Sequence, residues 1–252
     1  MNEKRRQLLT GISLAGAGVL LNACRKTPGG SGAATNNETK SGEPASGEKE
    51  TIEVTAAEDL MREHGILRRA LLVYQETATR LRQDPATVSA DDLEKTANLF
   101  RVFGEEYHEK KLEEVFIFPI VGKAPGAAAQ YVDTLLAQHD RGRQITEYVL
   151  SISQADKIGS NSVEPLAKAL ESFVRMYEHH AALEDTVIFP AWKSAVGQGE
   201  LDALGEKFEE IEHQQFGEDG FETALKRMEE IETSFGLSNL AMFTAPPPPG
   251  VK

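Results

Sequence analysis

The chain has 252 residues, of which 40 are acidic and 27 basic, so its formal net charge at pH 7 is −13. This length is enough for one good-sized domain or two small ones. The acidic balance argues against a nucleic-acid-binding protein and against one that a polybasic surface draws to anionic lipid.

The N-terminus is expected to be an export signal, covering residues 1–23. A basic head at Arg5 and Arg6 precedes an apolar run from Leu8 to Leu21, which is too short to span a bilayer as a mature helix. The two arginines fit a twin-arginine signal, which exports a protein that has already folded. The alternative is an ordinary Sec signal with incidental arginines.

Cys24 is the only cysteine, which excludes an intramolecular disulfide. The sequence Leu21-Asn-Ala-Cys24 resembles a bacterial lipobox, in which the cysteine is lipidated and becomes the new N-terminus. We therefore expect an exported lipoprotein that faces the periplasm or cell exterior and meets the membrane only through its lipid anchor. The alternative is a stray cysteine that is lost with the signal. Residues 24–52 are rich in small and polar residues, which predicts a disordered tether.

The segment 53–192 shows helical spacing of apolar residues and no competing strand pattern. Thr55 and Glu58 form a predicted capping box, and Ser89 or Asp91 caps the second helix. The expected helices cover about 55–81, 89–118, 128–152 and 163–190, with the second and fourth ending at Phe-Pro sequences. Short connections between four long helices predict an all-α, up-down-up-down four-helix bundle.

The remaining residues are expected to add to this bundle rather than to form a second domain. Within 193–240 two charged segments, 201–215 and 221–235, are predicted to be additional helices packed on its outside. The Pro-rich tail, 241–252, is expected to be extended or disordered.

Two of the predicted helices carry similar motifs. His108 precedes Glu113, and His180 precedes Glu184, and each glutamate is followed six residues later by a proline. Residues four apart project from one helix face about one turn apart, so His180 and Glu184 can reach the same site.

The other two helices carry one histidine each, His64 and His139. Imidazole suits iron, zinc and copper, while a carboxylate bridges two cations. Two metal ions a few ångströms apart repel one another strongly in a low-dielectric interior, so anionic bridges are needed to hold them. Four histidines and two glutamates on four helices therefore predict a dinuclear metal site inside the bundle.

His108 and Glu113 are five residues apart, which on an ideal α-helix separates their directions by about 140°. A single-turn π-bulge between them would restore a common face, and such bulges concentrate at functional sites. In the alternative, Glu109 takes the ligand position and His108 turns away. We favour His108, because imidazole is the better terminal ligand.

Four segments resemble the hemerythrin-like, HHE cation-binding family over about residues 55–192: Met61-Arg-Glu-His64-Gly, Tyr107-His-Glu-Lys, Gln138-His139-Asp and His180-Ala-Ala-Leu-Glu184-Asp-Thr-Val-Ile-Phe-Pro. The resemblance implies a hemerythrin-like bundle around a non-haem di-iron centre with an oxo or hydroxo bridge, other divalent metals being alternatives. The ligands that it implies are His64, His108, Glu113, His139, His180 and Glu184.

Arg143 departs from the pattern of oxygen-carrying hemerythrins, which place a second histidine at that position. With one histidine fewer, the resemblance implies a more open coordination sphere. The chain then looks more like the relatives linked to nitric oxide, peroxide and iron–sulfur repair chemistry. Repair relatives carry a cysteine-bearing N-terminal domain, which this chain lacks.

We therefore expect a metal-binding protein that binds or reduces a small oxidant such as oxygen, peroxide or nitric oxide. One alternative is an iron-holding or redox- or gas-sensing lipoprotein without turnover. Another is a purely structural bundle, whose metal content would not change when His139 or His180 is replaced.

Overall fold

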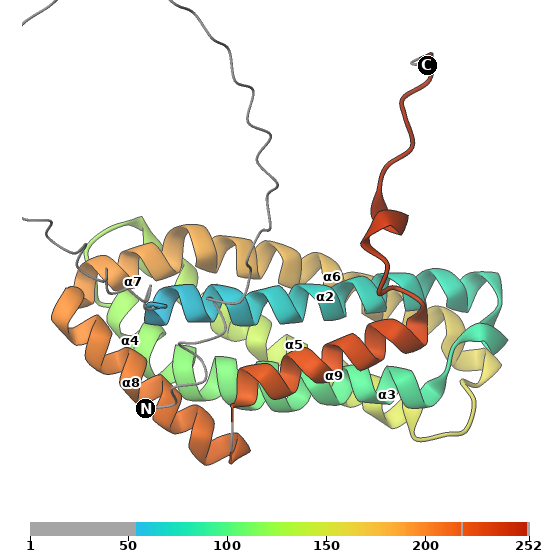
Figure 1. The fold of residues 1–252 in the computed structure, drawn as a ribbon, viewed down its shortest axis with the longest axis horizontal. Coiled ribbons are helices and arrows are strands. Elements are labelled where there is room, and N and C mark those ends of the chain that lie inside the picture. Colours follow the sequence, from blue (N-terminus) through green and yellow to red (C-terminus); the bar gives the residue numbers. More distant parts are fainter. Residues whose placement is uncertain (1–53, 218, 251–252) are drawn as a thin grey trace, which may run out of the picture. The chain divides into compact units, whose positions relative to one another are not determined.

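The structure, a computed structural model, describes residues 54–217 and 219–250. Every regular element in these residues is a helix (Figure 1), and none of them is both long and apolar enough to cross a membrane. The predicted export signal, Cys24 and the tether up to residue 52 lie outside the described residues.

The first helix of the bundle, α2 (Ala56–Gln83), begins at the predicted capping box. The Thr55 hydroxyl accepts a hydrogen bond from the Glu58 amide, and the Glu58 carboxylate accepts one from the Thr55 amide. After the short 3-10 helix η2 (Pro85–Thr87), α3 (Ala90–Leu99) begins with Ser89 as its cap. Ser89 is thus the cap of the second helix, and the alternative, Asp91, lies inside the helix.

The second and fourth helices change their winding before they reach the Phe-Pro sequences. The second continues from α3 into the π-helical η3 (Phe100–Ile117) and α4 (Phe118–Val121). The fourth runs through α6 (Val163–Leu183), the π-helical η6 (Glu184–Ile188) and α7 (Phe189–Val196).

The predicted ends of these two helices at Phe-Pro were wrong, because both helices continue past the proline. The Phe118 amide bonds to the carbonyl of Glu113, and the Phe189 amide bonds to that of Glu184, each five residues back. Each proline therefore falls in the first turn of a new α-helical segment, where its missing N–H and fixed φ are tolerated.

The third helix, α5 (Val132–Ser153), follows the 3-10 turn η4 (Ala127–Tyr131), and η5 (Ser160–Ser162) leads into α6. Helix α2 packs against α6, and α5 packs against both α3 and α6, which closes the predicted four-helix bundle (Figure 1). The predicted all-α bundle is therefore confirmed.

Two further helices pack on the outside of the bundle. Helix α8 (Gln198–Phe216) lies against α2, η3 and α7, and α9 (Gly220–Phe235) lies against α2 and α3. The short 3-10 helix η7 (Leu240–Phe243) follows, and the described part of the tail after it has no helix.

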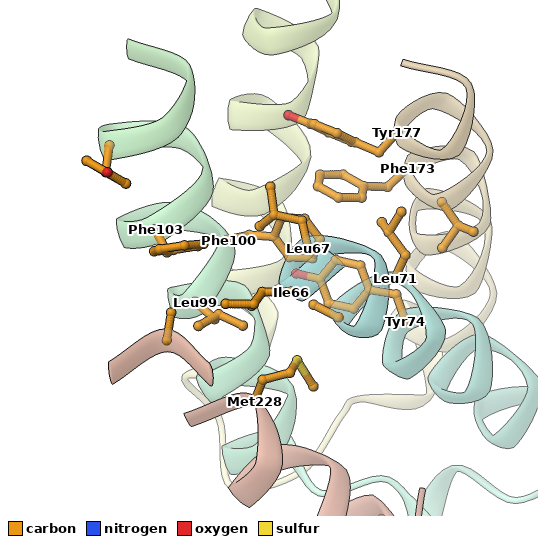
Figure 2. Close-up of a cluster of buried hydrophobic side chains, with 14 of the residues drawn as sticks. Ile66, Leu67, Leu71, Tyr74, Leu99, Phe100, Phe103, Phe173, Tyr177 and Met228 are labelled. Carbon is orange, nitrogen blue, oxygen red and sulfur yellow. The ribbon is translucent and has the colours of Figure 1, made fainter. Parts of the chain in front are cut away.

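An aromatic cluster fills the core between α2, η3 and α6 (Figure 2). The ring of Phe100 lies 5.2 Å from that of Tyr74 and 4.9 Å from that of Phe173, and the rings of Phe173 and Tyr177 are 4.5 Å apart. Leu67 and Leu71 of α2 complete the cluster. Aromatic pairs at such distances contribute packing energy beyond their buried area, so this cluster fixes the helices that carry the site residues.

Candidate metal centre

All six predicted site residues meet in the interior of the bundle. They come from α2, η3, α5, α6 and η6, and each is 0–3% exposed: His64, His108, Glu113, His139, His180 and Glu184. Two overlapping groups of these side chains have ligand atoms close enough together to hold a metal ion, and both groups contain Glu113.

The histidines form two pairs, and in each pair the two Nε2 atoms lie close to one another. The Nε2 atoms of His64 and His108 lie 3.0 Å apart, and those of His139 and His180 lie 3.1 Å apart.

Each glutamate reaches one histidine of each pair. Glu113 is 3.3 Å from the Nε2 of His108 and 3.3 Å from that of His139. Glu184 is 3.1 Å from the Nε2 of His180 and 3.5 Å from that of His64. Two histidine pairs with two carboxylates between them form a buried donor set that is compatible with metal binding.

The π-helical winding of η3 gives His108 and Glu113 a common face, although they are five residues apart. The predicted single-turn bulge is in fact a π-helical segment of 18 residues, Phe100–Ile117. Glu109, the alternative ligand, accepts hydrogen bonds from Tyr177 and Arg143 instead. His108 is therefore the residue that faces Glu113, while its role as the metal ligand of this helix stays a prediction.

Every Nδ1 atom of the four histidines contacts an oxygen acceptor outside this inner group. The partners are Asp185 for His64 at 2.7 Å, Glu63 for His108 at 2.6 Å, Glu114 for His139 at 3.0 Å and Gln138 for His180 at 2.9 Å. Because these oxygens accept, each Nδ1 donates its proton, and an imidazole in its neutral form then presents its Nε2 lone pair to the interior.

These outer partners were not predicted, yet each is the sequence neighbour of an inner residue. Neighbouring residues on a helix point about 100° apart, so the neighbour of an inward residue is directed towards an adjacent helix. Glu63, for example, follows this rule beside His64 and orients His108 on another helix. An acidic or amide residue next to each of four inward donors is a signal that the sequence did contain.

Acidic neighbours raise the pKa values of His64, His108 and His139. Burial alone would lower the pKa of His139, but Glu109, Glu113 and Glu114 outweigh it and raise this pKa to about 10. Burial opposes the shift of His108 as well, yet Glu113 holds its pKa well above the ordinary 6.5.

The same contacts lower the pKa values of Glu113 and Glu114. Burial would raise the pKa of Glu113, but His108 and His139 hold it well below its ordinary range. The hydrogen bond from His139, helped by Arg143, lowers the pKa of Glu114 to about 2. The cluster therefore favours ionised carboxylates.

The four carboxylate oxygens of Glu113 and Glu184 indicate what the cluster fits. All four are buried and have no hydrogen-bond donor of adequate geometry among the described residues. A buried carboxylate without such donors is costly, and coordination of a cation removes that cost. The imidazole and carboxylate donors, with hydrogen-bonded outer partners, fit two transition-metal ions.

A small void lies beside the donors, with the apolar side chains of Leu67, Leu71 and Ala181 and the ring of Tyr177 in its wall. Arg68, which is 40% exposed, also lines the void and pairs with Asp185. The void has room for about one water molecule and lies next to His180, Glu113 and Glu184.

Gly142 makes room for the hydroxyl of Tyr177, because a Cβ atom at this position would lie 2.1 Å from it. We expect Gly142→Ala to lower the free energy of unfolding by about 1–3 kcal/mol, although alanine normally favours a helix interior. Urea denaturation checks this, with Gly65→Ala as the matched control because a Cβ there meets nothing within 4 Å. Equal effects of the two substitutions would contradict the prediction.

Comparisons with known proteins show a family whose sequences this chain matches. The family model described as hemerythrin HHE cation binding domain matches residues 55–192, and a second match to it covers residues 130–241. Uncharacterized proteins of Mycobacterium bovis and of two strains of Mycobacterium tuberculosis are each 38% identical over 242 residues, which is 95% of this chain and 90% of each relative. No solved structure matches the chain significantly.

Proposed function

Because the chain belongs to the hemerythrin HHE cation-binding domain family, we propose that its buried cluster holds two iron ions and binds or reduces a small oxidant. Oxygen, peroxide and nitric oxide are the candidate oxidants. The observation that carries the proposal is the set of four buried carboxylate oxygens, without hydrogen-bond donors, between two histidine pairs.

Glu113 and Glu184 would bridge the two ions, with His64 and His108 holding one ion and His139 and His180 the other. When bound, iron supplies electrons and an open coordination position for the oxidant. The protein holds each imidazole at a fixed angle through its Nδ1 partner, and such partners typically contribute 10–100-fold to metal affinity or activity.

The protein also selects which molecules can reach the open coordination position. The apolar wall of the void, at Leu67, Leu71 and Ala181, favours small uncharged molecules over hydrated ions. On the side of Tyr107, the ring of Phe216 from α8 packs over the tyrosine at 5.3 Å and keeps water away from Glu63 behind it. Selection by size and polarity supports an uncharged oxidant as the ligand.

Glu184→Ala is expected to remove the bound iron, because it deletes one of the two bridging carboxylates. The wild-type protein should contain two iron ions per chain and show near-ultraviolet oxo-to-iron absorption, and the variant should bind iron at least about 100-fold more weakly. Elemental analysis and absorption spectra measure both quantities.

The matched control is Glu178→Ala, which removes an exposed glutamate from α6, the segment that continues directly into η6, and should leave iron content unchanged. A wild-type protein with one zinc ion or no metal would refute the proposal. Spectral change or turnover on addition of oxygen, peroxide or nitric oxide, each tested alone, then identifies the oxidant. An iron-loaded protein that responds to none of the three would limit it to metal storage.

A further inference from the structure

Tyr177 is a buried tyrosine in contact with both the candidate metal centre and a carboxylate. It lies one turn before His180 on α6, is 5% exposed, and its ring centre is 5.3 Å from that of His180. Its hydroxyl donates a 2.5 Å hydrogen bond to Glu109 and lies against the same void as Glu184.

The surroundings of this hydroxyl hold it in one position. Gly142 leaves the space that the hydroxyl fills, and Arg143 holds the acceptor, Glu109, through a contact of 3.1 Å. A phenol with a fixed carboxylate acceptor can lose its proton along an existing hydrogen bond when an electron leaves its ring.

Aromatic rings continue from Tyr177 into the core (Figure 2). Phe173 is 4.5 Å from Tyr177, and Phe100 is 6.0 Å from it. Tyr74 lies 5.4 Å from Phe173 and 5.2 Å from Phe100, and it is fully buried. This packing encloses Tyr177 and shields an oxidised form of its ring from solvent.

We propose that Tyr177 is a redox-active residue that gives one electron to the metal centre and its hydroxyl proton to Glu109 while peroxide is reduced. The inference rests on the proposed function, because it requires iron in the cluster and hydrogen peroxide as the oxidant. Tyr177 loses one electron and one proton and becomes a neutral tyrosyl radical. Glu109 keeps the proton from the Tyr177 hydroxyl. Peroxide takes up the electron from Tyr177, a second electron that a ferrous ion held by the cluster would supply, and two protons from solvent, and it gives two waters.

Tyr107 is the other tyrosine with a buried carboxylate acceptor, and its position is less suited to this role. Its hydroxyl donates to Glu63 at 3.1 Å, and Glu63 also binds the Nδ1 of His108. Tyr107 is not part of the wall of the void, and its ring contacts Phe103 in the core and Phe216 of the outer helix α8.

The test is electron paramagnetic resonance of the full-length protein, loaded with two iron ions per chain of which one is ferrous, and frozen within seconds of adding one equivalent of hydrogen peroxide. The wild-type protein should give a tyrosyl radical signal that narrows when the protein is grown with ring-deuterated tyrosine. Tyr177→Phe should lower that signal at least tenfold at unchanged iron content and circular dichroism. Tyr148→Phe, which alters a half-buried tyrosine on α5, is the matched control and should keep the signal.

The outcomes separate this inference from the proposed function. A protein that binds no iron would overturn both. Iron that peroxide oxidises without any radical, or a radical that persists in Tyr177→Phe and disappears in Tyr107→Phe, would overturn the role of Tyr177 alone. If Tyr177→Phe loses iron, Tyr177→Trp provides a second variant, and a radical with the hyperfine pattern of tryptophan at that position supports the role.

Discussion

Metal-free protein is expected to lose stability as the pH rises from 6.5 towards 10, the range between the ordinary histidine pKa and that of His139. Burial opposes protonation of His64, but Asp185 and Glu184 outweigh it and raise its pKa, and acidic neighbours raise that of His108 as well. A group whose pKa is raised by folding stabilises the folded state fully below its unfolded pKa, and this contribution is lost as the pH rises through the folded pKa.

The glutamates set the lower limit of the pH range in which the cluster stabilises the metal-free protein. Despite burial and mutual repulsion, neighbouring histidines lower the pKa of Glu113 and of Glu184 from the ordinary 4.5. Their contribution is present above 4.5 and is lost as the pH falls through the folded pKa values. The cluster should therefore stabilise metal-free protein most between about pH 4.5 and 6.5.

Metal-loaded protein should behave differently, because coordination requires neutral imidazoles and displaces their protons. Below the raised pKa, each displaced proton makes metal binding more favourable by about 1.4 kcal/mol for every unit by which the pH rises. Thermal unfolding with Zn²⁺ as a redox-inert probe should show a gap between loaded and metal-free protein that widens from about pH 6.5 to 8.5. Glu184→Ala should show little gap at any pH, and a wild-type gap that stays constant or narrows would contradict the prediction.

Trp192→Ala is expected to cost about 3–5 kcal/mol of unfolding free energy. The side chain is fully buried, its Nε1 donates to the carbonyl of Phe116 at 3.1 Å, and its ring stacks on Phe208 at 6.0 Å. It therefore ties α7 to η3 and α8, close to the ends of the two π-helical segments. Because these segments carry Glu113 and Glu184, the variant should also lose iron more readily.

Chemical denaturation and iron content after dialysis measure the two effects of Trp192→Ala. Trp192→Phe keeps much of the apolar volume but leaves the Phe116 carbonyl without its donor, so it should cost about 1–2 kcal/mol. Leu72→Ala removes a side chain that is 41% exposed and should change stability by less than about 0.5 kcal/mol. If Trp192→Ala costs no more than Leu72→Ala, Trp192 does not hold the helices together.

Much of the fold could be predicted from the sequence, because its signals are local. Apolar residues at helical spacing, the capping box at Thr55 and the cap at Ser89 depend on neighbours within a few residues. The six inner residues could be named for the same reason, since each lies on the buried face of its own helix. Their convergence is a finding of the structure, while their role as metal ligands stays a prediction.

The length of the π-helical winding could not be predicted. The separation of five positions from His108 to Glu113 required one wider turn, but nothing local indicated that the π-helical winding extends over η3 or that a second π segment begins at Glu184. The pairing of outer acceptors with histidines was also missed, because it depends on which helices are neighbours. That information lies in packing between distant segments, such as Asp185 of η6 against His64 of α2.

The spacing of His108 and Glu113 has a consequence for how such a site arises in evolution. A π-helical turn holds one residue more than an α-helical turn, so the extra residue corresponds to the insertion of a single codon. No substitution at His108 or Glu113 reproduces what that insertion does, because it rotates every side chain before it relative to every side chain after it. The number of residues between the histidine and the glutamate of one helix thus decides whether the two side chains face the same point.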